Sequence, residues 1–89
     1  MTLRDEDIAR TILELLAARA PGATICPSDA ARALAGTEAA WRALMPDVRR
    51  VAASLVQDGR LRVTQHGDDV DALAARGPIR LARPPGPAS

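Results

Sequence analysis

Six arginines in the second half of the chain have the chemistry of phosphate contacts. Three lie within WRALMPDVRRVAASLVQDG, residues 41–59, and three follow it; the six are Arg42, Arg49, Arg50, Arg60, Arg62 and Arg80. A guanidinium group donates hydrogen bonds in a planar fork that fits a phosphate or the edge of a guanine. The pattern therefore predicts double-stranded DNA as a partner, contacted mainly through residues 42, 49 and 50.

The overall charge gives this prediction only modest support. The 89 residues contain 12 basic side chains, all arginine, against 11 acidic ones, so the formal net charge is +1. Nucleic-acid binders often carry a larger basic excess, because phosphate neutralisation supplies most of their non-specific affinity. The same arginines suit a solvated surface. The alternative function is a protein-interaction module without nucleic-acid binding, whose partner is another protein or a second copy of the chain.

No group of residues has the spacing of a catalytic or metal site. Cys26 is the only cysteine, so an intramolecular disulfide and a site built on cysteine pairs are both excluded. It precedes a predicted helix, and we expect a shielded structural thiol. His66, Asp68, Asp69 and Asp71 have turn chemistry rather than the spacing of a calcium loop. We therefore expect no enzyme activity, no cofactor and no metal.

The elements that position the arginines begin with a helix over residues 5–19, DEDIARTILELLAAR. Its apolar residues recur at helical spacing, and three acids occupy the first turn, where the helix dipole favours them. Ala-Pro-Gly at 20–22 ends this helix. Residues 23–26 are predicted to be extended, since Thr24 and Ile25 are β-branched and Pro27 follows.

Two further helices follow. The first spans PSDAARALAG, with Ser28 as its N-cap and Gly36 at its end. The second spans residues 38–58, or 46–58 if Pro46 restarts it. Its apolar residues form one broad stripe facing the core, and Trp41 is expected to anchor the core beneath it. The arginines at 42, 49 and 50 fall on the opposite side.

After Gly59 the apolar period changes from helical to two. Residues 60–65 and 78–82 alternate as half-buried strands, with Arg60, Arg62 and Arg80 outward. Residues 66–69 are a predicted turn, and a single helical turn capped by Asp71 is expected before Gly77. Asp68 and Asp69 would repel phosphate if this connection approached DNA.

The order helix, strand, helix, helix, strand, strand predicts an α+β winged helix. It has three helices and a three-stranded antiparallel sheet formed by 23–26, 60–65 and 78–82, with a wing at 66–77. Residues 1–83 are one winged-helix domain, and the Pro-rich residues 84–89 form a flexible tail. A plain helix–hairpin α+β domain is the alternative arrangement.

Four segments also resemble a family. TICPSDAARAL, WRALMPDVRRVA, GRLRVTQHG and RGPIRL, in this order, are similar to a small bacterial family of unknown function, domain of unknown function 3253. The resemblance covers roughly residues 8–82. It implies a small winged-helix-like protein, and it assigns no activity and no functional residue.

The sequence favours a cytoplasmic location. No run approaches the ~18 apolar residues of a membrane span, and the first ten residues are acidic, unlike a secretory signal. A single cysteine is compatible with a reducing compartment. We therefore expect no membrane partner.

Overall fold

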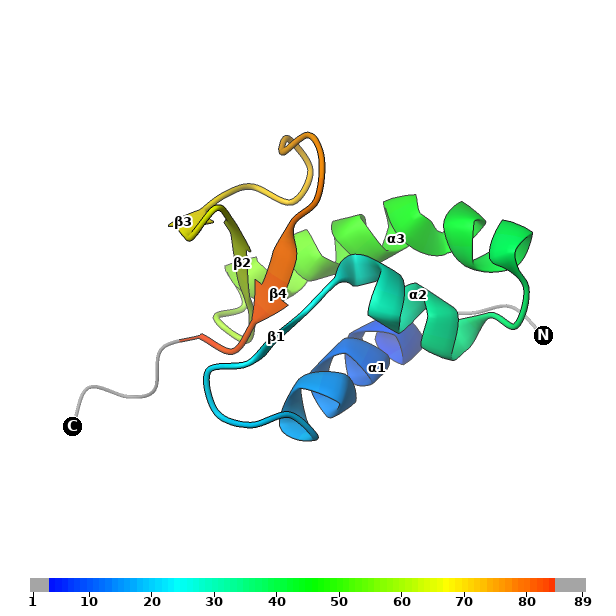
Figure 1. Ribbon diagram of the computed structural model, residues 1–89, viewed down its shortest axis with the longest axis horizontal. Coiled ribbons are helices and arrows are strands. Elements are labelled where there is room, and N and C mark those ends of the chain that lie inside the picture. The colour runs from blue at the N-terminus through cyan, green and yellow to red at the C-terminus, as the bar shows by residue number, and fades with distance from the viewer. Residues whose placement is uncertain (1–3, 85–89) are drawn as a thin grey trace.

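The computed structural model describes residues 4–84 and has an α+β fold of three helices and one antiparallel sheet (Figure 1). The helices are α1 (Asp5–Ala17), α2 (Pro27–Leu34) and α3 (Glu38–Gln57). The strands are β1 (Thr24–Ile25), β2 (Arg62–Gln65), β3 (Asp68–Asp69) and β4 (Arg80–Ala82). Apart from Pro84, the predicted tail lies outside the described residues.

The sheet has four strands rather than the predicted three. All neighbours are antiparallel, in the order β1-β4-β2-β3. The extra strand, Asp68–Asp69, comes from the segment predicted to be a turn. His66 and Gly67 have φ angles of 54° and 86°, as the two central residues of a type I′ hairpin turn require. This turn places Asp68 opposite Gln65, so hairpin geometry overrides the low strand propensity of aspartate.

The start of α2 also differs from the prediction. Cys26, not Ser28, is the N-cap, and Pro27 is the first helical residue. Proline suits that position because its missing N–H would have no partner inside the helix. The carboxylate of Asp29 accepts a hydrogen bond from the Cys26 N–H at 2.9 Å, which satisfies the backbone at the cap.

Helix α3 runs without a restart through Pro46. This residue is exposed, so the backbone donor is lost on the solvent side of the helix, where the loss costs least. The Thr37 hydroxyl caps the helix by accepting from the Ala40 N–H at 3.2 Å. The result is one continuous 20-residue helix, the longest of the three (Figure 1).

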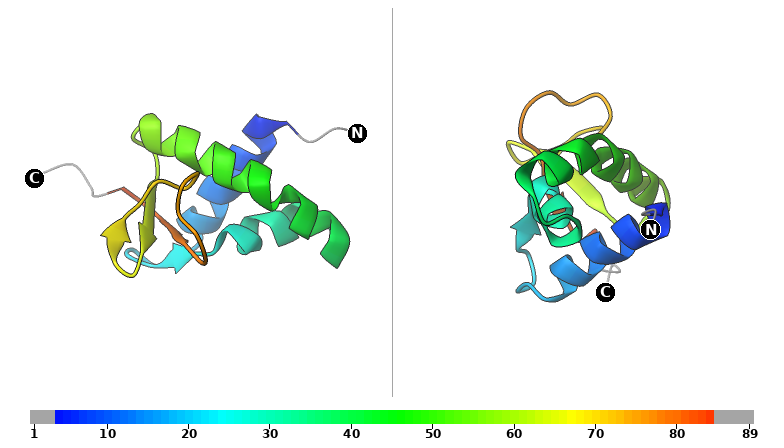
Figure 2. Two further views of the ribbon diagram at one scale, coloured as in Figure 1. Left: turned by 90° about the horizontal axis from the view of Figure 1, so that it is seen from above. Right: turned by 90° about the vertical axis from the view of Figure 1, so that its right-hand side faces the viewer.

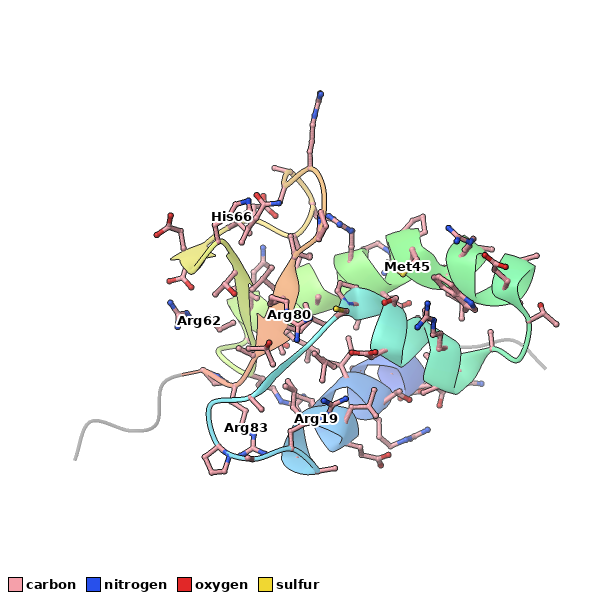
Figure 3. All side chains as sticks on the ribbon, in the orientation of Figure 1. Arg19, Met45, Arg62, His66, Arg80 and Arg83 are labelled. Atoms are coloured by element: carbon pink, nitrogen blue, oxygen red, sulfur yellow. The ribbon has the colours of Figure 1, made fainter. Side chains whose placement is uncertain are left out.

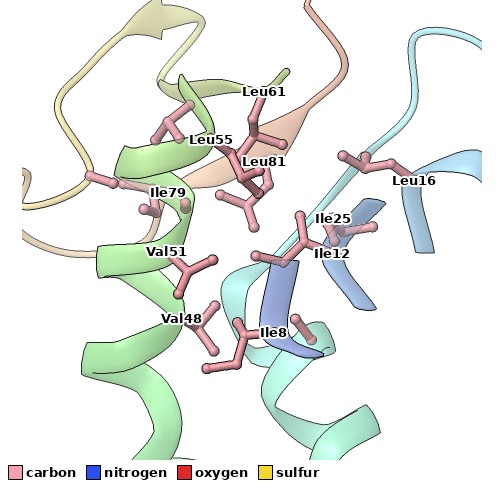
Figure 4. Packing of buried hydrophobic residues seen from close by; sticks show 14 of the residues in the cluster. Ile8, Ile12, Leu16, Ile25, Val48, Val51, Leu55, Leu61, Ile79 and Leu81 are labelled. Atoms are coloured by element: carbon pink, nitrogen blue, oxygen red, sulfur yellow. The ribbon is translucent and has the colours of Figure 1, made fainter. Parts of the chain in front are cut away.

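One apolar cluster joins the three helices to the inner face of the sheet (Figure 4). The predicted helical and strand periodicities are confirmed by its members: Ile8, Ile12, Leu16, Ile25, Ala30, Ala31, Val48, Val51, Ala52, Leu55, Leu61, Val63, Ala72, Ile79 and Leu81. Because side chains alternate along a strand, Ile25, Val63 and Leu81 point into this core. Their neighbours along the strands form the outer face of the sheet.

The segment between β3 and β4, residues 70–79, is called here the connecting loop. It begins with the predicted helical turn, in which Asp71 accepts hydrogen bonds from the N–H groups of Leu73, Ala74 and Ala75. The loop then passes against α3, as two perpendicular views show (Figure 2). It therefore presents its backbone beside the outer face of that helix.

Within residues 4–84, none of the helices combines the length and the apolar character that crossing a lipid bilayer requires.

Candidate nucleic-acid interface

The first predicted contact on α3, Arg42, is paired with a carboxylate one helical turn away. Its Nη2 lies 2.8 Å from Oε1 of Glu38, and both side chains are well exposed. Its guanidinium carbon also lies 4.9 Å from the centre of the Trp41 ring. The Glu38 carboxylate cancels the charge of Arg42 locally, so this arginine adds little positive potential to the helix surface.

The second arginine, Arg50, faces α1 and is neutralised there. Both Nη atoms contact the carboxylate of Asp5, at 2.6 and 2.7 Å, and Nη2 also lies 3.3 Å from Oδ1 of Asp47. These contacts raise the pKa of Arg50, first through the hydrogen bond to Asp5. The hydrogen bonding from Arg50 also lowers the pKa of Asp5, against the opposing effect of desolvation.

The third arginine, Arg49, holds the connecting loop on α3. Its Nη1 donates to the carbonyl of Ala75 at 2.9 Å, and its Nη2 donates to the carbonyl of Gly77 at 2.7 Å. Gln65 binds the alternate carbonyls, since its Nε2 donates to the carbonyl of Arg76 at 2.6 Å and to that of Pro78 at 3.1 Å. Four successive backbone acceptors, those of residues 75–78, are thus satisfied by two side chains.

Arg60 is separated from the other predicted contacts. It does not belong to a strand, because β2 begins at Arg62, and it borders two shallow hollows beside α1. Glu6 lies in both hollows, and Arg10 lies in one of them. The structure therefore groups Arg60 with α1 and not with the sheet arginines.

Arg62 and Arg80 do come together, on the outer face of the sheet. The register pairs Arg62 with Ala82 and Thr64 with Arg80, so both arginines project from the same face. Arg62 Nε donates to Oδ1 of Asp69 at 2.5 Å. Arg80 instead contacts neutral groups: the hydroxyl and the carbonyl of Thr24, at 2.7 and 3.1 Å, and the sulfur of Cys26 at 2.6 Å.

Two arginines that the sequence analysis did not select lie beside these two, one after the end of α1 and one after β4 (Figure 3). Arg83 follows β4 and donates through Nη2 to the carbonyls of Leu16 and Arg19, the second at 2.9 Å. Arg19 follows the end of α1 and is exposed. We call Arg19, Arg62, Arg80 and Arg83 the cationic face (Figure 3). With Asp69 as its one bound carboxylate, its formal charge is four minus one, or +3.

A shallow groove of about 550 Å³ lies on this face. Arg62 and Arg83 border it, and no carboxylate does. Most of its other lining residues are small: Pro21, Gly22, Ala23, Thr24, Thr64, Gly67, Ala82 and Pro84. Small side chains let an extended ligand backbone come close to the protein, and the arginines supply the charge that a phosphate chain requires.

Trp41 lies at the edge of the core. It is partly buried and packs against the buried cluster without belonging to it. The guanidinium carbons of Arg32 and Arg42 lie 4.6 and 4.9 Å from its ring centre, within the range of cation–π attraction. Its ring therefore forms part of a surface as well as supporting α3.

The other polar candidates do not assemble into a reaction centre. Cys26 is partly buried, and its sulfur contacts Arg80. His66 is exposed at the hairpin turn. Among residues 4–84, no three His, Cys, Asp or Glu side chains gather closely enough to hold a metal ion.

Comparison with known proteins supplies a family and no activity. The family model described as "Protein of unknown function (DUF3253)" matches residues 5–84. No curated protein matches the chain.

Proposed function

The chain belongs to the DUF3253 family of proteins of unknown function, and we propose that this member is a DNA-binding module of the winged-helix type. The element order supports a winged-helix arrangement, since three helices precede the hairpin and β1 pairs with the last strand. Winged-helix proteins commonly bind DNA, but the fold alone does not determine function. The proposal therefore depends on where uncompensated positive charge lies.

The cationic face carries that charge. The partners of Arg80 and Arg83 are a hydroxyl, a thiol and backbone carbonyls, which hold each guanidinium in place without cancelling its charge. A held guanidinium loses little conformational entropy when it meets a phosphate. This observation carries the proposal: phosphate contacts come from the outer face of the sheet.

The outer face of α3 remains the second candidate surface, because the sequence pattern favours it. Arg49 supports it, since its partners are also carbonyls and its charge is not cancelled. Arg42 and Arg50 do not, because both contact carboxylates. On either surface the proposed activity is that of a binding module rather than an enzyme, and the proposal includes the cytoplasmic location expected from the sequence.

Binding to a random-sequence DNA duplex tests the function and the surface together. Fluorescence anisotropy should give a dissociation constant of roughly 10⁻⁴–10⁻⁶ M at physiological salt, the usual range of non-specific binding, and tighter binding at low salt. A triple variant, Arg62→Gln, Arg80→Gln and Arg83→Gln, should bind at least ~10-fold more weakly. Glutamine keeps a hydrogen-bond donor for the internal partners, and a thermal melt checks that the variant is folded.

The matched control is a double variant on α3, Arg42→Gln with Arg50→Gln, which should bind DNA like the wild type. A larger loss in this control would assign DNA to α3 instead of the sheet. Failure of the wild type to bind DNA at low salt would contradict the proposed function itself.

A further inference from the structure

A second groove, on the opposite side of Cys26 from the sheet, has different chemistry. It has a volume of about 380 Å³, at the small end of the ~300–1,000 Å³ range of ligand pockets. Its apolar lining comes from three separate segments: Pro27 at the start of α2, Trp41 and Met45 on α3, and Pro78 and Ile79 beside β4. We call it the apolar groove; its polar members are Cys26, Ser28, Arg42 and Arg49.

The charged residues that line the apolar groove are all basic, although Glu38 and Asp29 lie next to it through their contacts with Arg42 and Cys26. Arg42 and Arg49 line it, Arg32 stacks on its Trp41 ring, and no acidic residue is among its lining residues. The positive end of the α2 dipole also opens beside it, at Pro27. Of the two lining arginines, Arg42 has a carboxylate partner, Glu38, and Arg49 has only carbonyl partners. The groove therefore favours a ligand with an apolar part and a carboxylate.

The apolar groove is lined by residue types that often supply much of the binding energy in protein interfaces. Tryptophan and arginine are enriched among interface hot spots, and methionine adapts its shape to different apolar partners. Trp41 and Met45 are both only partly buried, so a ligand side chain entering the groove would remove further apolar surface from water. Figure 3 shows Met45 on α3, away from the labelled arginines of the cationic face.

We propose that the apolar groove binds a short acidic peptide segment of a partner protein. An apolar side chain of that segment packs on Trp41 and Met45, and a neighbouring carboxylate pairs with Arg49, whose charge no carboxylate offsets. The small volume fits one anchoring side chain with its flanking backbone rather than a folded surface. The apolar groove shares no residue with the cationic face, although Arg80 of that face contacts the sulfur of Cys26. Its Arg42 and Arg49 belong to the second candidate surface on α3, so the two sites are independent only if DNA contacts the cationic face.

A random peptide library displayed on phage, selected on the immobilised protein, tests this proposal. We expect enriched peptides that place Asp or Glu next to a large apolar residue. Trp41 is the only tryptophan, and the chain has no tyrosine or phenylalanine, so its fluorescence reports directly on the groove. Synthetic copies of the enriched peptides should change Trp41 emission, and copies with Lys in place of each acid should bind at least ~10-fold more weakly.

Two variants at one position link the response to the groove. Met45→Glu should weaken peptide binding at least ~10-fold, because it places a carboxylate where the apolar side chain of the ligand packs and adds repulsion to the ligand carboxylate. Met45→Leu keeps an apolar side chain of similar size and should bind within ~3-fold of the wild type. Thermal melts of both variants separate loss of binding from loss of fold.

The proposal would be overturned if the library gave no enriched peptides, or if the enriched peptides lacked acidic residues. Peptide binding that stays unchanged in the Met45→Glu variant would also contradict it. A concentration-dependent dimer that Met45→Glu abolishes would assign the groove to a second copy of the chain. A change in Trp41 emission on adding duplex DNA, reversed by the triple variant of the cationic face, would assign the groove to DNA.

Discussion

The outer face of α3 and the outer face of the sheet each carry arginines, but the two sets differ in whether carboxylates neutralise them. On α3, Arg42 and Arg50 contact Glu38, Asp5 and Asp47, so their charges are cancelled within the protein. At the sheet, Arg80 and Arg83 contact only neutral groups and remain positively charged toward solvent.

The difference teaches that the number of arginines on a face does not give its potential. A carboxylate partner neutralises the charge of a guanidinium group. A carbonyl or hydroxyl partner only accepts its hydrogen bonds and leaves the charge available. Arg49 lies on α3, but its partners are carbonyls and its charge therefore remains available. Its main role is to hold the connecting loop, so its loss should affect the fold rather than DNA binding alone.

The largest expected effect is therefore a loss of stability in the Arg49→Ala variant. Removing this side chain leaves the carbonyls of Ala75 and Gly77 without their charged donor. We expect a loss of about 1–3 kcal/mol in the free energy of unfolding, the usual value of hydrogen bonds to a charged group. Urea denaturation followed by circular dichroism measures it.

Arg42→Ala is the matched control, because Arg42 lies on the same helix in an exposed pair with Glu38. Its loss should cost about 0.5 kcal/mol or less, as is typical of a surface ion pair. Equal losses in the two variants would show that the connecting loop does not depend on Arg49.

Much of the fold was predictable from the sequence because the periodic spacing of apolar residues indicates the type of each element and its buried face. The helical repeat of α1 and the alternation around Val63 and Leu81 both follow from burying one face, and both predictions are confirmed. The strand at Asp68 and the cap at Cys26 were missed. Each depends on local backbone geometry, a type I′ turn in one case and a proline at the first helical position in the other, rather than on hydrophobic pattern.

The candidate site was less predictable, because it depends on pairings between distant segments. Outward directions for Arg62 and Arg80 followed from strand alternation. The contact of Arg50 with Asp5 spans 45 positions and has no local signal. Arg83 was also missed, since the carbonyls that hold it, those of Leu16 and Arg19, lie 67 and 64 positions away in the sequence.

A smaller effect should come from Asp69, the one carboxylate bound on the cationic face. Asp69→Asn removes the charge that offsets Arg62, so DNA affinity at low salt should rise by roughly 3–5-fold, about the value of one exposed ion pair. Asp68→Asn is the control, because Asp68 pairs with Gln65 and its side chain lies on the other face of the hairpin. An equal rise in both variants would indicate a general charge effect instead of the release of Arg62.

The smallest effect concerns acid stability on the α3 side. The hydrogen bond from Arg50 lowers the pKa of Asp5, so this pair stabilises the fold above the unfolded-state pKa of the carboxyl. The contribution is lost as the pH falls through the lower native pKa. Asp5→Asn should thus be slightly less stable than the wild type at neutral pH and equal to it in strong acid.

Thermal melts across this pH range measure the difference, with Glu14→Gln as an exposed control on the same helix. A difference between Asp5→Asn and the wild type that persists unchanged into strong acid would contradict an origin in the ion pair.

The salt dependence of DNA binding tests the central claim most directly, because it counts phosphate contacts. The three arginines of the cationic face other than Arg62, whose charge Asp69 offsets, predict a slope of log K against log salt of about −2.7 for the wild type. The triple variant of the cationic face should retain a slope of about −0.9, and the double variant Arg42→Gln with Arg50→Gln should match the wild type. A slope that falls in the α3 variant and stays unchanged in the cationic-face variant would contradict the account.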